Sequence, residues 1–162
     1  MPKINIPTKK ECIAILTKNK TPSNIIKHCK AVCKVAEDVA KKLIKKGIKV
    51  NKGLVAAAAL LHDAERLKKN HVARGARLVK KLGYPEVANV ISKHTLYKLK
   101  NNEPKTIEEK IVFYADKRVK HDKIVTLEER YKDLKERYKL SDFGALNWEM
   151  EFTKKIEKEL GQ

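Results

Sequence analysis

The chain of 162 residues is long enough for one domain with a sizeable core, and its 42% hydrophobic and 36% charged residues are typical of a globular protein. Only 6 glycines and 5 prolines favour helices with short connections, and three cysteines are too few for a disulfide framework. Lysine and arginine number 38 against 20 acidic residues, and the resulting charge of +18 indicates an anionic partner such as a phosphorylated metabolite, a nucleotide or a nucleic acid.

No stretch approaches 18 consecutive apolar residues, and the first residues lack the apolar segment of a secretory signal. We therefore expect no membrane span and a cytoplasmic protein. Cys12, Cys29 and Cys33 agree with a reducing compartment. Cys29 and Cys33 lie one helical turn apart and close to His28, so a soft-metal site is an alternative to simple core packing, the commoner role of free cysteines.

Caps and breakers divide the chain into predicted helices. Pro7-Thr8 opens the first helix, Thr21-Pro22 is typical of a cap followed by proline at the first helical position, and Gly47 ends that second helix. Asn51 is the next predicted cap, and Thr106 begins a capping box. After the first helix, the helices are predicted at 22–46, 54–63, 71–82, 85–94, 106–116, 127–138 and 142–160. Because no stretch alternates with a period of two, we expect an all-α bundle of seven to eight helices.

Two histidines fall on the apolar stripes of these helices. His28 comes three residues after Ile25 and four before Val32, and His94 comes three residues after Ile91. This spacing keeps a side chain on the same helix face as its apolar neighbours. Both imidazoles are therefore predicted to point into the core.

Two carboxylates also fall at buried positions. The apolar run that begins at Leu54 ends in the pair His62-Asp63, and Asp116 lies four residues after Val112 and three before Val119. A lone carboxylate in a core is energetically costly. These residues therefore need a partner.

The inward polar groups are better explained as a set than singly. A single buried histidine is usually a hydrogen-bonded core residue, but a group of histidines and aspartates from five segments is typical of a transition-metal centre. His71 lies at the start of a predicted helix, so periodicity does not show which way its side chain points. The candidate ligands are His28, His62, Asp63, His71, His94 and Asp116.

Their order along the chain resembles a known signature. His28, then His62-Asp63, then Asp116 is similar to the motif of the HD-domain superfamily of metal-dependent phosphohydrolases, an all-α fold, and Ala-Leu-Leu-His-Asp is similar to its central motif. His71 and His94 resemble the two extra histidines of its binuclear, HDIG-like branch. The resemblance covers roughly residues 25 to 119.

The resemblance implies one or two divalent transition-metal ions per chain, with iron, manganese, zinc, cobalt and nickel all open. It implies a first metal held by His28, His62, Asp63 and Asp116, with Asp63 bridging to a second metal held by His71 and His94. Two such cations supply hydroxide from a shared water at neutral pH, and the hydroxide attacks phosphorus. Asp63 is accordingly expected to be essential for catalysis.

Arg66 stands where relatives often carry a lysine, three residues after the aspartate of the motif. Arginine keeps the positive charge and can bind phosphate through two donors, but it cannot donate a proton as lysine can. We expect Arg66 to act in catalysis and substrate binding as a phosphate clamp; a solvated loop cation is the alternative. Arg74, one turn after His71, and Lys117, next to Asp116, are further candidate substrate-binding residues.

Two other patterns have plainer explanations. His121-Asp122 is a second His-Asp pair at the polar end of its helix, and we expect it to bind no metal. Trp148, Phe152 and Ile156 recur every four residues, which indicates core packing, with docking on a second copy as the alternative.

The sequence thus predicts one HD-type domain over residues 1–162, with core motifs at 25–119 and C-terminal helices within 127–160. The predicted function is metal-dependent hydrolysis of a phosphorylated small molecule, with nucleotides as the favoured class. The alternative is a module that binds a nucleotide or RNA on the same scaffold without turnover.

Overall fold

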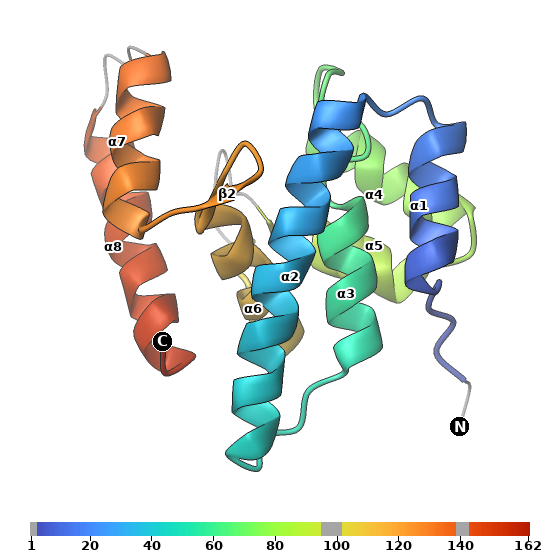
Figure 1. Ribbon diagram of the computed structural model, residues 1–162, viewed down its shortest axis with the longest axis horizontal. Coiled ribbons are helices and arrows are strands. Elements are labelled where there is room, and N and C mark those ends of the chain that lie inside the picture. Colours follow the sequence, from blue (N-terminus) through green and yellow to red (C-terminus); the bar gives the residue numbers. More distant parts are fainter. Residues whose placement is uncertain (1–2, 95–101, 139–142) are drawn as a thin grey trace.

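The computed structural model describes residues 3–94, 102–138 and 143–162. The described residues form eight α-helices and one two-stranded hairpin (Figure 1). In chain order they are α1 (Lys9–Lys18), α2 (Ser23–Lys45), α3 (Lys52–Leu61), α4 (His71–Lys81), α5 (Pro85–Ile91), α6 (Ile107–Lys117), β1 (Val119–Lys120), β2 (Lys123–Ile124), α7 (Leu127–Tyr138) and α8 (Phe143–Glu159). The all-α prediction is confirmed. Residue 142, the predicted start of the last helix, lies outside the described residues.

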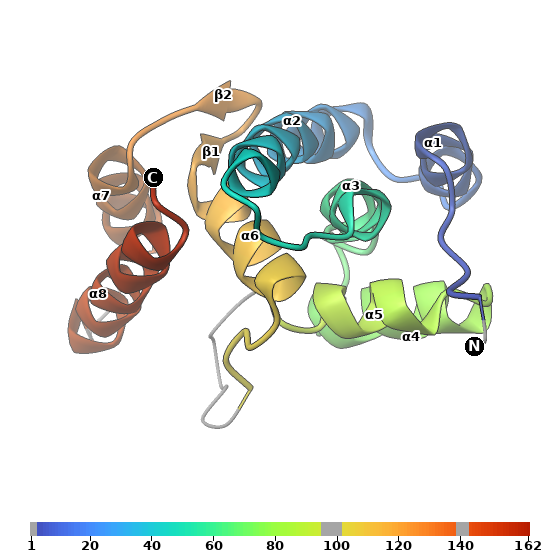
Figure 2. The ribbon, with the colours of Figure 1, turned by 90° about the horizontal axis from the view of Figure 1, so that it is seen from below.

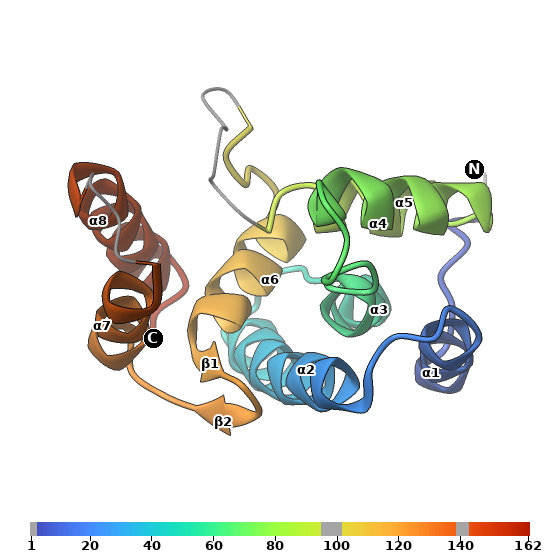
Figure 3. The ribbon, with the colours of Figure 1, turned by 90° about the horizontal axis from the view of Figure 1, so that it is seen from above.

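Helix α3 is the centre of the bundle. Figures 2 and 3 show it enclosed by α1, α2, α5 and α6, and its residues from Val55 to Leu61 are all buried. Four consecutive alanines, Ala56 to Ala59, make this helix slim, so that its neighbours can approach closely on every side. Helix α2 lies along α3 and α6, and its buried stripe carries apolar residues such as Val32 and Leu43.

The predicted caps mostly form as expected. The Asn51 side chain accepts a hydrogen bond from the Leu54 amide, and Thr106 forms its capping box. Gly47, at φ +83°, ends α2 with a backbone conformation that suits glycine. The Thr21 prediction is wrong by one position: Pro22 is the N-cap, and the Thr21 hydroxyl donates instead to the Ala64 carbonyl at 3.0 Å.

The hairpin of β1 and β2 was not predicted. Val119 pairs with Ile124 and Lys120 with Lys123 in an antiparallel register. Strands of two residues are too short to show an alternating pattern, which explains why they could not be predicted. The hairpin lies against α2 and joins α6 to α7.

Helices α7 and α8 pack on each other to one side of the bundle, with α8 against α6 (Figure 1). Ile156 and Leu160 of this C-terminal pair are buried, whereas Trp148 is 56% exposed and stacks on Phe152. The predicted apolar stripe is therefore only partly used inside the chain. No helix in the described part of the chain has both the length and the apolar character needed to cross a bilayer.

Candidate metal centre

Four of the predicted ligands form a first cluster, whose ligand atoms all lie within 4.8 Å of one another. His28 comes from α2, His62 and Asp63 directly follow α3, and Asp116 comes from α6. Asp116 Oδ1 lies 3.1 Å from His28 Nε2 and 3.3 Å from His62 Nε2. Asp63 Oδ2 lies 3.6 and 3.4 Å from the same two nitrogens. Two nitrogens and two carboxylate oxygens thus face one point.

The remaining two histidines form a second cluster around Asp63. His71 is the first residue of α4, and His94 lies three residues after the end of α5. Their Nε2 atoms lie 3.7 and 3.6 Å from Asp63 Oδ1. Asp63 therefore presents Oδ2 to the first cluster and Oδ1 to the second, which is the arrangement expected of a bridging ligand.

Neighbouring residues can share this site because α3 ends at Leu61. In a continuous helix, residues i and i+1 point in different directions. His62 is instead the C-cap, and the chain continues in tight turns in which the Ala64 amide donates to the Leu61 carbonyl. The end of the helix turns both His62 and Asp63 toward the same interior space.

Backbone carbonyls orient three of the imidazoles. His62 Nδ1 donates to the Ala59 carbonyl at 2.7 Å, and His94 Nδ1 donates to the Ile91 carbonyl at 2.7 Å. His28 Nδ1 donates to the His121 carbonyl at 2.6 Å. A bond at Nδ1 fixes the tautomer and leaves Nε2 as the free nitrogen, as is usual for histidines that bind metals.

His121 was missed as a contributor to this site. Its side chain is exposed and lies outside both clusters of the described residues, in the hairpin turn and not at a helix end, but its carbonyl orients His28. The turn between β1 and β2 places that carbonyl, with His121 at φ +57°. A backbone carbonyl has no side-chain signature, so no sequence pattern could have found it.

The donor set fits a cation. His62 Nε2 and Asp63 Oδ1 are buried and have no hydrogen-bond partner among the described residues. Burial alone would raise the pKa of Asp63, but His62 and His94 outweigh it and hold that pKa well below its usual range. An ionised carboxylate and an unsatisfied imidazole nitrogen in a buried space suit a first-row transition metal.

The remaining predicted residues lie at different depths around the clusters. Arg66 Nη1 lies 3.3 Å from His71 Nε2, beside the second cluster. Burial, together with the charge of Arg66, lowers the pKa of His71 despite the nearby Asp63. Arg74 is exposed on α4, one turn beyond His71. Lys117 is buried behind Asp116 and faces α8, so its predicted contact with substrate and that of Arg74 stay predictions.

The soft-metal alternative finds no support. Cys12, Cys29 and Cys33 are all buried, and neither of the two His-Asp clusters found among the described residues contains a cysteine. Burial raises the pKa of Cys12 to about 12 and that of Cys33 to about 11, so both remain thiols at neutral pH.

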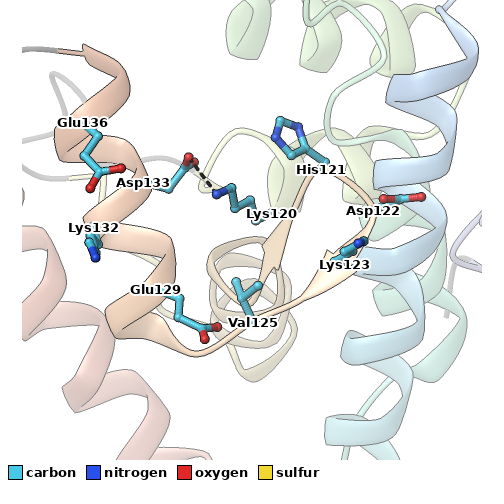
Figure 4. Close-up of a pocket in the computed structure, with 9 residues that line it drawn as sticks. All are labelled: Lys120, His121, Asp122, Lys123, Val125, Glu129, Lys132, Asp133 and Glu136. Carbon is cyan, nitrogen blue, oxygen red and sulfur yellow. Dashed lines mark ion pairs between the residues drawn. The ribbon is translucent and has the colours of Figure 1, made fainter.

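A cavity of about 630 Å³ lies between the β1–β2 hairpin and α7, away from the six ligands (Figure 4). Its walls carry charges of both signs, and Lys120 Nζ lies 3.2 Å from an Asp133 oxygen. Since acidic and basic side chains neutralise each other there, it has no net attraction for phosphate. Its lining residues are Lys120, His121, Asp122, Lys123, Val125, Glu129, Lys132, Asp133 and Glu136.

Comparison with known proteins found relatives that match about three quarters of the chain. The chain is 34% identical over 140 residues to a tRNA (cytidine(56)-2'-O)-methyltransferase of Picrophilus torridus and 30% identical to the protein of that name in Thermoplasma volcanium. Each match covers 76% of this chain but only 40% of the relative. An uncharacterized protein of Methanocaldococcus jannaschii is 30% identical over 138 residues, covering 75% of this chain and 82% of the relative. No solved structure matches the chain.

The family comparison matches the region of the clusters. The model of the HD domain matches residues 25–119, more than half of the chain, and that range contains all six candidate ligands described above. The chain therefore belongs to the HD-domain superfamily.

Proposed function

We propose that the protein is a metal-dependent phosphohydrolase that acts on a phosphorylated small molecule, with nucleotides as the favoured class. The observation that carries this proposal is the shared carboxylate: Asp63 presents one oxygen to each of two adjacent clusters. Two metals that share a ligand suit the displacement of a group at phosphorus, and no protein nucleophile is then needed.

Metals bound at the two clusters would activate water and neutralise charge on phosphoryl oxygens. The chain itself would do the positioning. Hydrogen bonds from Nδ1 of His28, His62 and His94 to carbonyls hold each Nε2 toward the carboxylates. Arg66 lies beside the second cluster, where its guanidinium can bind a phosphate through two donors. The depth of the clusters limits the access of bulk water.

The test compares two Asp→Asn substitutions. Asp63→Asn should abolish hydrolysis across a panel of nucleotides and phosphate esters, and should lower the metal content determined by elemental analysis, with little change in helicity. Asp38→Asn is the matched control, because Asp38 is exposed on α2 and away from the clusters. Normal turnover by Asp63→Asn would refute the proposal.

The methyltransferase name is not transferred to this chain, since it belongs to proteins of which the chain spans only 40%. It does favour RNA as a partner in a second candidate function, which is RNA binding. A groove of about 550 Å³ between α2 and the hairpin is lined by Lys27, Lys30, Lys34 and Lys123, with Asp122 as its acidic residue. No ion pair in the described part of the chain uses these four lysines.

RNA binding is tested by charge reversal. The triple variant Lys27→Glu/Lys30→Glu/Lys34→Glu should weaken binding of a transcribed tRNA and reduce the salt dependence of log K by about 2, since each phosphate contact contributes roughly 0.7 to 0.9. Reversal of the exposed Lys52, Lys80 and Lys81, which gives the same net charge, is the control. Equal losses in both variants would show that only overall charge matters.

A further inference from the structure

Lys117 is a buried ammonium group next to a metal ligand. Its side chain is only 9% exposed, and its Nζ lies 3.4 Å from Asp116 Oδ2 and 3.5 Å from Glu149 Oε1. The same ammonium lies 5.6 Å from the centre of the Phe113 ring. Lysine is almost never buried without a partner. These two carboxylates therefore account for its position.

The contact with Lys117 divides the roles of the two Asp116 oxygens. Oδ1 faces the first cluster, at 3.1 Å from His28 Nε2 and 3.3 Å from His62 Nε2. Oδ2 faces the opposite way, toward Lys117. The ammonium thus holds the carboxylate in the orientation that presents one defined oxygen to a metal.

Glu149 is itself held in place by the C-terminal helices. The Tyr131 hydroxyl, on α7, donates a hydrogen bond to Glu149 Oε1 at 3.0 Å. The same hydroxyl lies 2.9 Å from the Thr153 hydroxyl on α8. Tyr131 and Thr153 are both buried. These residues all lie beyond residue 119, where the HD-domain match ends.

Both acidic partners of Lys117 place a carboxylate oxygen within 3.5 Å of its ammonium group. An uncompensated ammonium close to the first cluster would repel a cation there. Glu149 supplies the compensating charge, so Lys117 can orient Asp116 without opposing the metal.

We propose that Lys117 and Glu149 are positioning residues for the first cluster, and that through them the α7–α8 pair completes the metal site. This inference rests on the metal centre of the proposed function but does not require turnover. It assigns to the C-terminal helices a role in metal binding that lies outside the HD-domain match.

The test measures Co²⁺ affinity by titration calorimetry in a His71→Ala background, which leaves the first cluster intact. Glu149→Gln should weaken binding by about 10- to 100-fold, the usual effect of losing a group that orients a metal ligand. Glu149→Asp keeps the charge and should restore part of the affinity. Glu157→Gln is the matched control, because Glu157 is also on α8 and accepts a hydrogen bond from Tyr114 of α6 at 2.7 Å.

Glu157→Gln should bind Co²⁺ like the background protein. Thermal melting of each metal-free variant shows whether α8 still packs on the bundle, so that a loss of packing can be told apart from a loss of ligand orientation. Unchanged affinity in Glu149→Gln, or an equal loss in Glu157→Gln, would overturn the inference. If the parent protein binds Co²⁺ but hydrolyses no phosphate compound, the proposed function is refuted. The Co²⁺ affinities of the Glu149 variants would still test whether Lys117 and Glu149 position the first cluster. A parent protein that binds no metal would overturn both.

Discussion

The helices that carry the metal ligands and the C-terminal pair α7–α8 are stabilised in different ways. Around α3 the contacts are apolar and close, and the ionisable groups are gathered at the two clusters. The C-terminal pair joins this apolar core through Leu127, Ile156 and Leu160. It also attaches through ion pairs, such as Lys110 with Glu159 at 2.9 Å and Lys120 with Asp133 at 3.2 Å. The apolar packing around α3 should respond little to salt, whereas the ion pairs of α7 and α8 should weaken in high salt and when their carboxylates are protonated.

The largest expected effect lies within the ligand-bearing helices. His71 is the most exposed of the six ligands, with 25% of its side chain accessible, while His62 is fully buried. His71→Ala should therefore remove the second metal and leave the first, lowering the metal content from two to one per chain. Hydrolysis should fall by about a hundredfold or more, because a catalytic metal contributes several kcal/mol. Elemental analysis that still finds two metals would contradict this assignment.

A smaller effect is expected at the edge of the same region. Arg66→Ala should raise KM by about 10- to 100-fold, the range for loss of a hydrogen bond to a charged group. Arg66→Lys should recover part of this loss, since it keeps the charge but not the two-donor geometry. Steady-state kinetics on the best substrate of the panel provide the measurement. If KM is the same in all three proteins, Arg66 does not contact the phosphate.

The smallest effect is expected in the C-terminal pair. Burial opposes ionisation of Asp133, but Lys120, Arg137 and Arg130 outweigh it and lower its pKa from 3.8. A lowered pKa stabilises the fold above pH 3.8, and this contribution is lost as the pH falls further. Asp133→Asn should cost about 1 kcal/mol at pH 7, because two of the cations that pair with it, Lys120 and Arg137, are 40% and 39% exposed and therefore screened by solvent.

Urea unfolding of the Asp133→Asn variant and the parent protein at several pH values checks this prediction. The difference in the free energy of unfolding should shrink below pH 3.8, where the carboxyl of the parent becomes protonated, and in high salt. A difference that persists unchanged at low pH would mean that Asp133 stabilises the fold through its shape and not its charge.

The helices and the candidate ligands could be predicted because both depend on local patterns. Helical periodicity placed His28 and Asp116 on inward faces, and the caps placed the helix starts to within a residue or two. The predicted helix 85–94 was wrong at its end: α5 stops at Ile91, and His94 is buried in the turn that follows it. The His121 carbonyl could not be predicted, since its role depends on a turn packed against another helix. The contacts of Lys117 could not be predicted either. Consecutive residues of a helix point in different directions, and the position of α8 beside α6 depends on how distant helices pack.

Two of the carbonyls that orient histidines have a further significance. Ala59 lies in the last turn of α3 and Ile91 is the final residue of α5, where carbonyls lack a partner within the helix. His62 and His94 bond to these carbonyls, so each imidazole is at once a candidate metal ligand and a cap for its own helix. Each such helix end is therefore a self-contained unit, in which the step that terminates the helix also aims the ligand.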